Sequence, residues 1–272
     1  MKKKENLKGT KPRKILEELI SRSEYLVVQD NDLAKSFGNL KAFEHKILDY
    51  CFSFVQKDSL PSEKFVLETT ILLKFLGLTS SGTNYKRVVD AFKTLNQGTA
   101  LYLPIVKEDG TRGIRMTQLF SFIDYYETGR VEFQFSEFAQ PYVFDLKKNY
   151  YSFHLRELAN IKGKYALILM KLWEANRFGN SQTTLINGTL EEWQTWFLGE
   201  ERRMTAGRFL HDVITRSAEE LEAKFPIDII FEQHKRGRKV IGYEMQIMER
   251  KDSSKPTLNY KENQASIYDY LD

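Results

Sequence analysis

The chain of 272 residues has a single cysteine, Cys51, and four histidines that are scattered along it. One cysteine excludes an internal disulfide and a cysteine-rich zinc site, and no two histidines stand at a His-x-His or His-x-x-x-His spacing. The sequence also lacks a GxxxxGK[ST] phosphate loop, a GxGxxG fingerprint and a GxSxG elbow. These absences leave no readable catalytic site, and they give no reason to expect a metal or a cofactor.

Long hydrophobic runs are missing as well. No apolar run approaches the roughly 18 to 20 residues of a membrane span, and the charged start MKKKENLKGT has no apolar stretch behind it. With 42% hydrophobic and 29% charged residues, the composition is that of a soluble globular protein rather than a disordered one. We therefore expect a cytoplasmic protein that does not interact with membranes.

Positive charge is concentrated at the N-terminus. The first 14 residues hold seven basic residues and one acid, whereas the whole chain has a net charge of +4. The rest of the chain therefore sums to −2, so net charge alone does not indicate nucleic-acid binding, and local clusters must decide. We expect residues 1–24 to form a basic flexible arm and residues 251–272, which have no periodic apolar face, to form a polar tail.

Between the arm and the tail, apolar periodicity predicts the same order of elements twice. In the first copy, Asn39 is expected to cap a helix that continues to Val55, and Gly98 is expected to end a second amphipathic helix. A strand-like stretch, a compact apolar segment and three extended runs complete the copy, at residues 65–67, 71–78, 101–106, 116–126 and 131–135.

The second copy begins with a helix whose apolar face runs from Ile161 to Leu172, followed by a short strand at 183–186. Thr189-Leu190-Glu191-Glu192 is a capping box that predicts the next helix, and a longer helix is expected from about Arg202 to Lys224. Its buried face is expected to carry Ala206, Leu210, Val213, Ser217 or Ala218, and Leu221. A hairpin around the turn 235–238 closes the copy, with Ile241, Tyr243, Met245 and Ile247 alternating on its second strand.

Helices followed by a β-hairpin in this order are typical of the winged-helix variant of helix-turn-helix. Because the order occurs twice, we predict an α+β fold with two tandem winged-helix domains, each a helical core with a β-hairpin wing. The expected boundaries are 25–146 for the N-terminal domain and 147–250 for the C-terminal domain.

Basic residues of the second copy gather at the two places that a winged helix uses to bind DNA. Four lie on the predicted third helix: Arg202, Arg203, Arg208 and Arg216. Four lie in the hairpin turn: Lys235, Arg236, Arg238 and Lys239. Glu219, Glu220 and Glu222 at the far end of the helix would be repelled by phosphates, so its N-terminal half is predicted to enter a major groove. A helix with basic and acidic faces can equally be solvated, but four like charges in one turn repel each other without a gain in packing, which favours a phosphate-binding wing.

The first copy has fewer basic residues. Its candidate DNA-contacting residues are Asn84, Lys86 and Arg87 at the start of a helix, and Lys107, Arg112 and Arg115 in its wing. We interpret them as contacts to the DNA backbone rather than to bases. A protein with two such modules also needs a dimer or partner surface, for which the aromatic stretch 119–126 is a candidate, although a core role is more ordinary for such side chains.

Four groups of residues, taken in their shared order, resemble a known family. They are Asn39-Leu40 with Ala42, Glu44 and Ile47-Leu48; Phe133 to Ser136 with Pro141 and Leu146; Phe153-His154-Leu155 with Ile161 to Ala166; and Thr189 to Glu192 and Leu198-Gly199 with Phe209, Val213-Ile214, Ala218, Glu220 and Leu221. They are similar to the Rep_3 family of bacterial plasmid replication initiators, over about residues 25–248. The chain departs from the family pattern at Ile168 and Met170, where members often have Arg and Tyr.

The resemblance implies a protein without enzymatic activity that binds tandem origin repeats (iterons) in double-stranded DNA as a monomer. It further implies repression of its own promoter as a dimer, and recruitment of the host initiator ATPase and the replicative helicase. The first domain would contact the DNA backbone and form the dimer interface, while the second reads bases. By position, the residues facing bases would be Arg202, Arg203, Thr205, Arg208 and His211, and those holding phosphates would be Lys235, Arg236, Arg238 and Lys239.

Two alternatives stay open from the sequence. A stand-alone winged-helix transcriptional repressor would bind one palindromic operator rather than an array of repeats. An origin-nicking enzyme with a tyrosine nucleophile would cleave its DNA.

Overall fold

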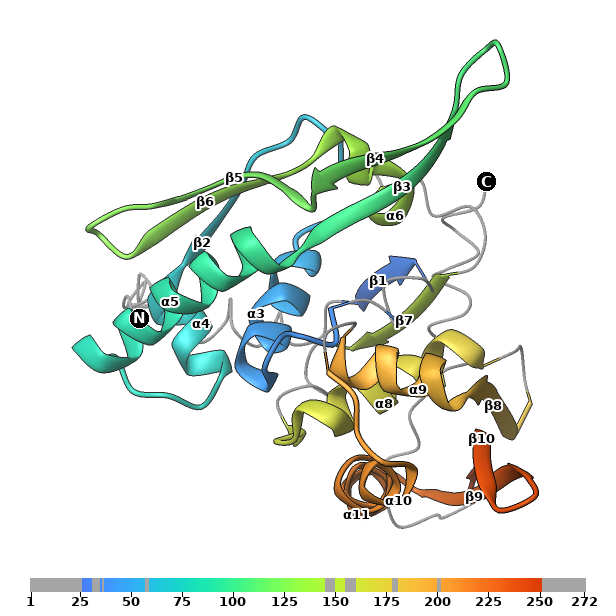
Figure 1. The fold of residues 1–272 in the computed structure, drawn as a ribbon. Coiled ribbons are helices and arrows are strands. Elements are labelled where there is room, and N and C mark those ends of the chain that lie inside the picture. Colours follow the sequence, from blue (N-terminus) through green and yellow to red (C-terminus); the bar gives the residue numbers. More distant parts are fainter. Residues whose placement is uncertain are drawn as a thin grey trace, which may run out of the picture.

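The computed structural model describes residues 26–30, 35, 37–56, 59–144, 150–154, 160–177, 181–199 and 202–250. The expected arm (1–24) and tail (251–272) lie outside the described residues, as do the residues next to the expected boundary between the two domains. Helices and small antiparallel sheets form two units, which occupy the upper and lower parts of Figure 1. In the part of the chain that the structure describes, no helix has the length and apolar character needed to cross a membrane.

The first unit packs three helices against a three-stranded sheet. The helices are α3 (Ala42–Phe52), α4 (Thr69–Phe75) and α5 (Gly82–Gly98). The sheet has the order β2-β6-β5 and consists of β2 (Phe65–Glu68), β5 (Phe120–Tyr125) and β6 (Arg130–Phe135). A separate hairpin of β3 (Ala100–Val106) and β4 (Arg112–Gln118) extends away from this body (Figure 1). The turns η1 (Glu137–Ala139) and α6 (Gln140–Val143) follow the sheet.

The second unit has the same plan. Its helices are α8 (Lys164–Asn176), α9 (Leu190–Leu198) and a continuous third helix made of α10 (Ala206–Phe209), η2 (Leu210–Thr215) and α11 (Arg216–Lys224). Its sheet has the order β8-β10-β9, from β8 (Thr183–Thr189), β9 (Ile227–Arg236) and β10 (Lys239–Glu249). The expected α+β fold with two winged-helix units is confirmed.

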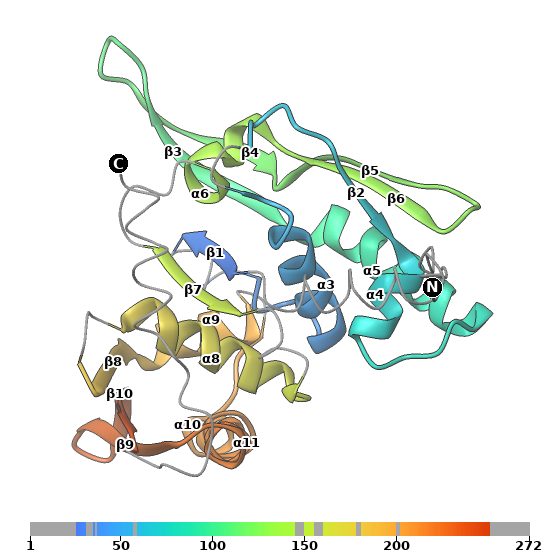
Figure 2. The same ribbon diagram turned by 180° about the vertical axis from the view of Figure 1, so that it is seen from behind.

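A short antiparallel ladder lies between the two units. It pairs β1 (Leu26–Asp30) with β7 (Tyr150–His154), and Leu26 stands opposite His154. Seen from behind, the ladder lies between the helices of the second unit and the sheets of the first (Figure 2). The first described strand of the chain is thereby joined to the strand that precedes α8.

The first helix begins later than the sequence predicts. The residue that caps α3 is Lys41 rather than Asn39, and the Glu44 carboxylate accepts a hydrogen bond from the Lys41 backbone N–H at 2.6 Å. The residues before it form a turn, in which the Leu40 N–H donates to the Phe37 carbonyl at 2.9 Å, and Leu40 is buried. The prediction of Asn39 as the cap was wrong because this turn carries Leu40 into the core before the helix starts.

The extended run predicted at 116–126 is two strands in different sheets. The chain leaves the β3–β4 hairpin at Leu119, whose N–H donates to the Thr99 carbonyl at 2.9 Å, and continues as β5 beside β6. Leu119 is fully buried, and its own carbonyl accepts the Ser136 N–H at 2.8 Å. The alternation of apolar residues carries no signal for such a change of sheet.

The third helix of the second unit begins at Ala206, so Arg202 and Arg203 precede it instead of lying on it. Within it, Leu210–Thr215 is a π-helical segment, which shifts the faces of the helix. Val213, Ser217 and Leu221 are buried as expected, but Ala206 and Leu210 are only half-buried, and Phe209 and Ile214 take their place. Ile241, expected to point inward, is exposed because the β9–β10 register shifts between Val240 and Gly242.

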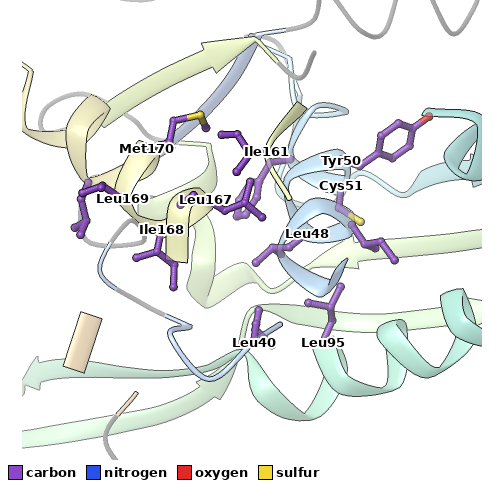
Figure 3. Close-up of a cluster of buried hydrophobic side chains, with 14 of the residues drawn as sticks. Leu40, Leu48, Tyr50, Cys51, Leu95, Ile161, Leu167, Ile168, Leu169 and Met170 are labelled. Atoms are coloured by element: carbon purple, nitrogen blue, oxygen red, sulfur yellow. The ribbon is translucent and has the colours of Figure 1, made fainter. Parts of the chain in front are cut away.

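One hydrophobic core runs through both units. Figure 3 shows where they meet: Leu48 of α3 lies beside Leu167 of α8, with Ile161 close by. Ile168 and Met170, where the family resemblance fails, are both buried in this core. Their apolar character therefore agrees with their surroundings.

His45 of α3 is a titratable group inside this core. Burial holds the pKa of His45 well below its usual value, and the positive charges of Lys171 and Lys164 lower it further. The imidazole is therefore neutral at pH 7. When the pH falls below about 6.5, the unfolded chain binds a proton at this residue that the folded chain does not, so the folded state loses stability as the medium becomes acidic.

We expect His45→Gln to reduce this loss. Between pH 7.5 and 5.5, the free energy of unfolding of the wild-type chain should fall by about 1 kcal/mol more than that of the variant. Urea denaturation at both pH values measures the loss in each protein. Groups that titrate alike in the two proteins cancel when the two losses are subtracted. An equal loss in both proteins would show that His45 titrates normally in the folded state.

Candidate nucleic-acid interface

Three of the expected DNA-facing residues surround one carboxylate on the third helix. The Arg208 Nε lies 3.2 Å from Asp212, the His211 Nδ1 lies 2.9 Å from it, and an Arg216 nitrogen lies 4.0 Å away. The side chains of these three are 68%, 74% and 68% exposed. Hydrogen bonds from His211 and Arg208, together with the charge of Arg216, hold the pKa of Asp212 below its usual range.

Asp212 is a residue that the sequence reasoning missed. Its spacing of four residues from both Arg208 and Arg216 is the signal that could have found it, since such residues are neighbours on a helix surface. The carboxylate restrains the two guanidinium groups and the imidazole toward one another and partly neutralises the arginines. The arrangement is an exposed cluster whose side chains are ordered by one acid.

The wing carries its four cations at its tip. Arg236 pairs with Lys239 across the turn, where Gly237 takes a positive φ of 62° that favours glycine. All four residues are exposed, and within the described part of the chain none of them forms an ion pair with an acid: Lys235, Arg236, Arg238 and Lys239. Uncompensated positive charge on an extended loop is what attraction to phosphates requires.

One aromatic cluster holds the helix and the wing on the same body. The Tyr243 hydroxyl of β10 donates to the Ala206 carbonyl at 2.9 Å, and the Tyr243 ring lies 6.1 Å from that of Phe209 and 4.9 Å from that of Phe231. The Trp193 indole N–H of α9 donates to the Tyr243 carbonyl at 3.2 Å. The position of the helix start relative to the wing is therefore set by buried contacts.

The segment before the helix is also held in place. Gln194 of α9 pairs with the Met204 backbone in both directions, each hydrogen bond being 2.8 Å long. The Arg203 guanidinium donates to the Gly199 carbonyl at 2.8 Å and to the Thr195 hydroxyl at 3.0 Å, and so caps the C-terminal end of α9. Thr205 is the N-cap residue of the third helix. Gln194, which is buried, was not singled out from the sequence.

A surface groove brings Arg203 together with Lys239. It lies between the start of α9 and the beginning of β10, and Glu191 also lines it. Arg202, next to Arg203, is exposed. The structure thus brings one cation from before the helix, Arg203, to the same groove as one wing cation, Lys239.

Two of the three acids at the far end of the helix, Glu220 and Glu222, bind backbone groups of the protein, whereas Glu219 is exposed. The Glu220 carboxylate accepts hydrogen bonds from the backbone N–H groups of Lys162, at 2.5 Å, and Gly163, at 3.0 Å, at the start of α8. The Glu222 carboxylate accepts the Ile229 N–H at 2.7 Å at the start of β9. These two carboxylates stabilise the starts of neighbouring elements, and backbone N–H groups compensate part of their negative charge.

In the first unit, each candidate on α5 already has a partner. The Asn84 amide donates to the Thr79 carbonyl at 2.8 Å, Lys86 pairs with Asp90 at 2.8 Å, and the Arg87 guanidinium lies 3.9 Å from the ring centre of Phe43. Lys86 and Arg87 nevertheless remain exposed.

The other first-unit candidates lie on the β3–β4 hairpin. Lys107 and Arg112 stand beside its exposed tip, while Arg115 lies with its guanidinium 4.3 Å from the ring centre of Phe138. The tip and the start of α5 are at opposite ends of the unit in both views (Figures 1 and 2). These six residues therefore do not form a single patch.

Two family models match the chain. The model described as "Initiator Replication protein, WH1" matches residues 26–174, and the one described as "Initiator Rep protein, WH2" matches residues 189–247. The chain belongs to the Rep_3 family of replication initiators. The division at residues 146 and 147 stays a prediction.

Two solved structures show the same fold. The Pi initiator protein, crystallised in complex with iteron DNA, superposes on this Rep_3 chain with a TM-score of 0.67 at 13% sequence identity, over 85% of this chain and 99% of that one. Domains 2 and 3 of RctB superpose with a TM-score of 0.50 at 14% identity, over 77% and 82%. No curated protein matches the chain in sequence.

The positions of Arg202 and Arg203 predict different effects on stability. Arg203→Ala removes hydrogen bonds that cap α9, so we expect the free energy of unfolding to fall by about 1 kcal/mol in the absence of DNA. Arg202→Ala, one residue away and exposed, should change it by less than about 0.5 kcal/mol. Urea denaturation measures both, and equal effects would show that Arg203 does not anchor the segment.

Proposed function

We propose that this chain initiates plasmid replication by binding tandem origin repeats in duplex DNA, with bases read by the second unit. The observation that carries the proposal is the family match across both units, together with the exposed cations on the third helix and the wing of the second. The fold likeness to an initiator crystallised with iteron DNA supports it. Binding takes place without strand cleavage, in the cytoplasm, where the plasmid is.

The two cationic elements have different roles. The front of the third helix presents Arg208 and His211, which are exposed side chains near a helix start, where base edges are read in the major groove. The wing presents exposed cations that form no ion pair within the described residues, which suits phosphates, since these are alike at every sequence. Arg203 acts by holding the segment before the helix, with Arg202 and Thr205 at the DNA surface.

The first unit contributes backbone contacts. Asn84, Lys86 and Arg87 lie near the start of α5, with side chains tied to the fold, which suits contacts that position a protein without reading sequence. Lys107, Arg112 and Arg115 lie on the β3–β4 hairpin, away from that helix start. They would contact DNA only at a separate place along the duplex.

Two substitutions separate base reading from phosphate binding. Arg208→Ala should reduce the difference in binding free energy between the preferred repeat and a mutated repeat by about 1–3 kcal/mol, because a bidentate contact to guanine is lost. Lys235→Ala should weaken binding to all duplexes alike and lower the slope of log affinity against log salt by about one unit. Fluorescence anisotropy over a range of salt concentrations measures both.

Each variant is the control for the other. Equal losses on every duplex for both variants would contradict the assignment of base reading to Arg208. A repeat located in the DNA beside the gene, or selected in vitro with the full chain, provides the preferred site.

We further propose that the chain represses its own promoter as a dimer formed through the β3–β4 hairpin. One face of this hairpin is apolar and exposed: Tyr102 is 66% exposed, Ile114 64% and Met116 77%, and Tyr102 stands opposite Met116. Within the described residues neither strand pairs with a third. An unpaired edge strand can join a second copy antiparallel about a two-fold axis, which extends the apolar face across both copies.

Met116→Glu places a charge in this face and should weaken dimerisation at least tenfold, as measured by sedimentation equilibrium. Binding to a single repeat should be retained, while binding to an inverted operator should be lost. Ile230→Glu, at another exposed apolar strand position in the second unit, is the matched control. An unchanged dimer constant for Met116→Glu would show that the hairpin is not the interface.

Neighbouring DNA separates the remaining alternatives. An array of direct repeats near one or two helical turns apart favours an initiator, and a lone inverted repeat favours a stand-alone repressor. An origin-nicking enzyme would leave relaxed plasmid or a covalent tyrosine adduct. Contacts with the host initiator ATPase and the replicative helicase are part of the proposed role.

A further inference from the structure

A buried ion pair joins the two units. Asp49 of α3 and Lys171 of α8 lie 122 residues apart in sequence, and the Lys171 Nζ is 2.6 Å from the Asp49 Oδ1. The side chains are 0% and 5% exposed, so both charges are withdrawn from water. The same two helices make the apolar contact of Figure 3, where Leu48 meets Leu167.

Two further acids act across the contact. Burial, together with the charge of Arg202, lowers the pKa of Lys164 to about 8, and the Glu44 carboxylate of α3 opposes this shift. Burial also lowers the pKa of Lys46, and the Glu220 carboxylate of the second unit opposes it. The Lys164 Nζ of α8 donates to the Gly38 carbonyl at 2.5 Å, a direct hydrogen bond between α8 and the turn before α3.

The turn before α3 fits closely on the end of α9. A Cβ atom added to Gly38 would lie 2.6 Å from the Trp196 carbonyl oxygen and 2.8 Å from the Gly199 backbone nitrogen. Both neighbours are backbone atoms of the second unit, which cannot move aside as a flexible side chain could. Only glycine permits this approach, so shape and charge specify the same contact.

These contacts affect the relative orientation of the two units more than they affect the free energy of unfolding. Apolar contacts are not directional, so the Leu48–Leu167 contact by itself tolerates sliding and rotation of one unit on the other. A buried ion pair is tolerated only where its partners meet, and a well-packed apolar pair of similar size would be about as stable. The charges therefore select one orientation among those that bury a similar apolar area.

We infer that the contact of α3 and its preceding turn with α8 and α9 fixes the orientation of the two units, with Asp49, Lys171 and Gly38 as positioning residues. It thereby sets the spacing between the DNA segments that one chain can contact at once. This second statement rests on the proposed function, whereas the first concerns the free protein alone.

The test uses the full chain with Asp49→Leu and Lys171→Met combined, which removes both charges at similar volume. Cysteines introduced at Lys93 and Glu219, exposed positions on α5 and α11, carry spin labels, since the natural Cys51 is buried. Thermal unfolding should stay within a few degrees of the wild-type midpoint. The distribution of label distances should become at least twice as wide.

The DNA measurement uses a duplex selected in vitro with the wild-type chain, and derivatives with two base pairs inserted at successive positions. At the most sensitive position, the insertion should reduce the affinity of the wild-type chain at least tenfold relative to the unmodified duplex. The same insertion should reduce the affinity of the double variant less than threefold. Gly38→Ala is an independent second variant, for which the same widening and the same tolerance are expected.

Removal of an ion pair within one unit is the matched control. Arg130→Gln with Glu132→Gln breaks a pair on β6 and should leave both measurements unchanged. Unchanged distances, or unchanged sensitivity to insertions, in the Asp49 and Lys171 double variant would overturn the inference. If no duplex is bound by the wild-type chain, the proposed function fails, and the distance measurement still decides whether these residues set the orientation.

Discussion

The third helix and the wing carry the exposed cations of the second unit, and both are held in place by one residue, Tyr243. Its hydroxyl holds the first carbonyl of the third helix, its backbone accepts the Trp193 indole N–H of α9, and its ring contacts Phe231 of the wing. Helix, scaffold and wing thus converge on a residue that is fully buried. Flexible cations are useful for reading a duplex only if the elements that carry them do not move relative to each other, and this cluster supplies that rigidity.

In the second unit, the positions of the charges matter more than their numbers. Outside the N-terminal 14 residues the chain has more acids than bases, yet the wing cations have no acidic partner within the described residues. Glu220 and Glu222 face inward, where backbone N–H groups at the starts of α8 and β9 bind them. A surface that attracts phosphates therefore forms on a chain whose overall charge gives no indication of it. Asp212 is the exception, and it orders two arginines and a histidine.

Local features of the fold could be read from the sequence, and long-range ones could not. The capping box at Thr189 is formed as expected, with the Glu192 N–H donating to the Thr189 hydroxyl, and Gly98 ends α5. These depend on neighbours within one helical turn. The change of sheet at Leu119 depends instead on Thr99 and Ser136, which bond its backbone from either side.

The candidate site shows the same division. Periodicity and charge located the third helix and the wing, but the position of Arg203 depends on the end of α9, which approaches it only in the folded chain. The π-helical segment gives no pattern of its own and moves Phe209 into the core in place of Leu210. Arg202 and Arg203 are alike in sequence, since both are basic and both precede a helix, but Arg203 bonds the end of α9 whereas Arg202 is exposed.

The contact between the two units combines an apolar part with an ionic part. A purely apolar junction would supply the free energy for association of α3 with α8, and the core there is already continuous. Asp49 and Lys171 add little to that free energy, because the loss of hydration offsets most of their attraction, but a misplaced orientation would leave each charge buried without the other. The cost of burying an unpaired charge therefore applies to other orientations of the two units and not to the observed one. The proposed binding of DNA by both units would need this kind of selectivity, since a small rotation at the junction becomes a larger displacement at the far ends of the two units.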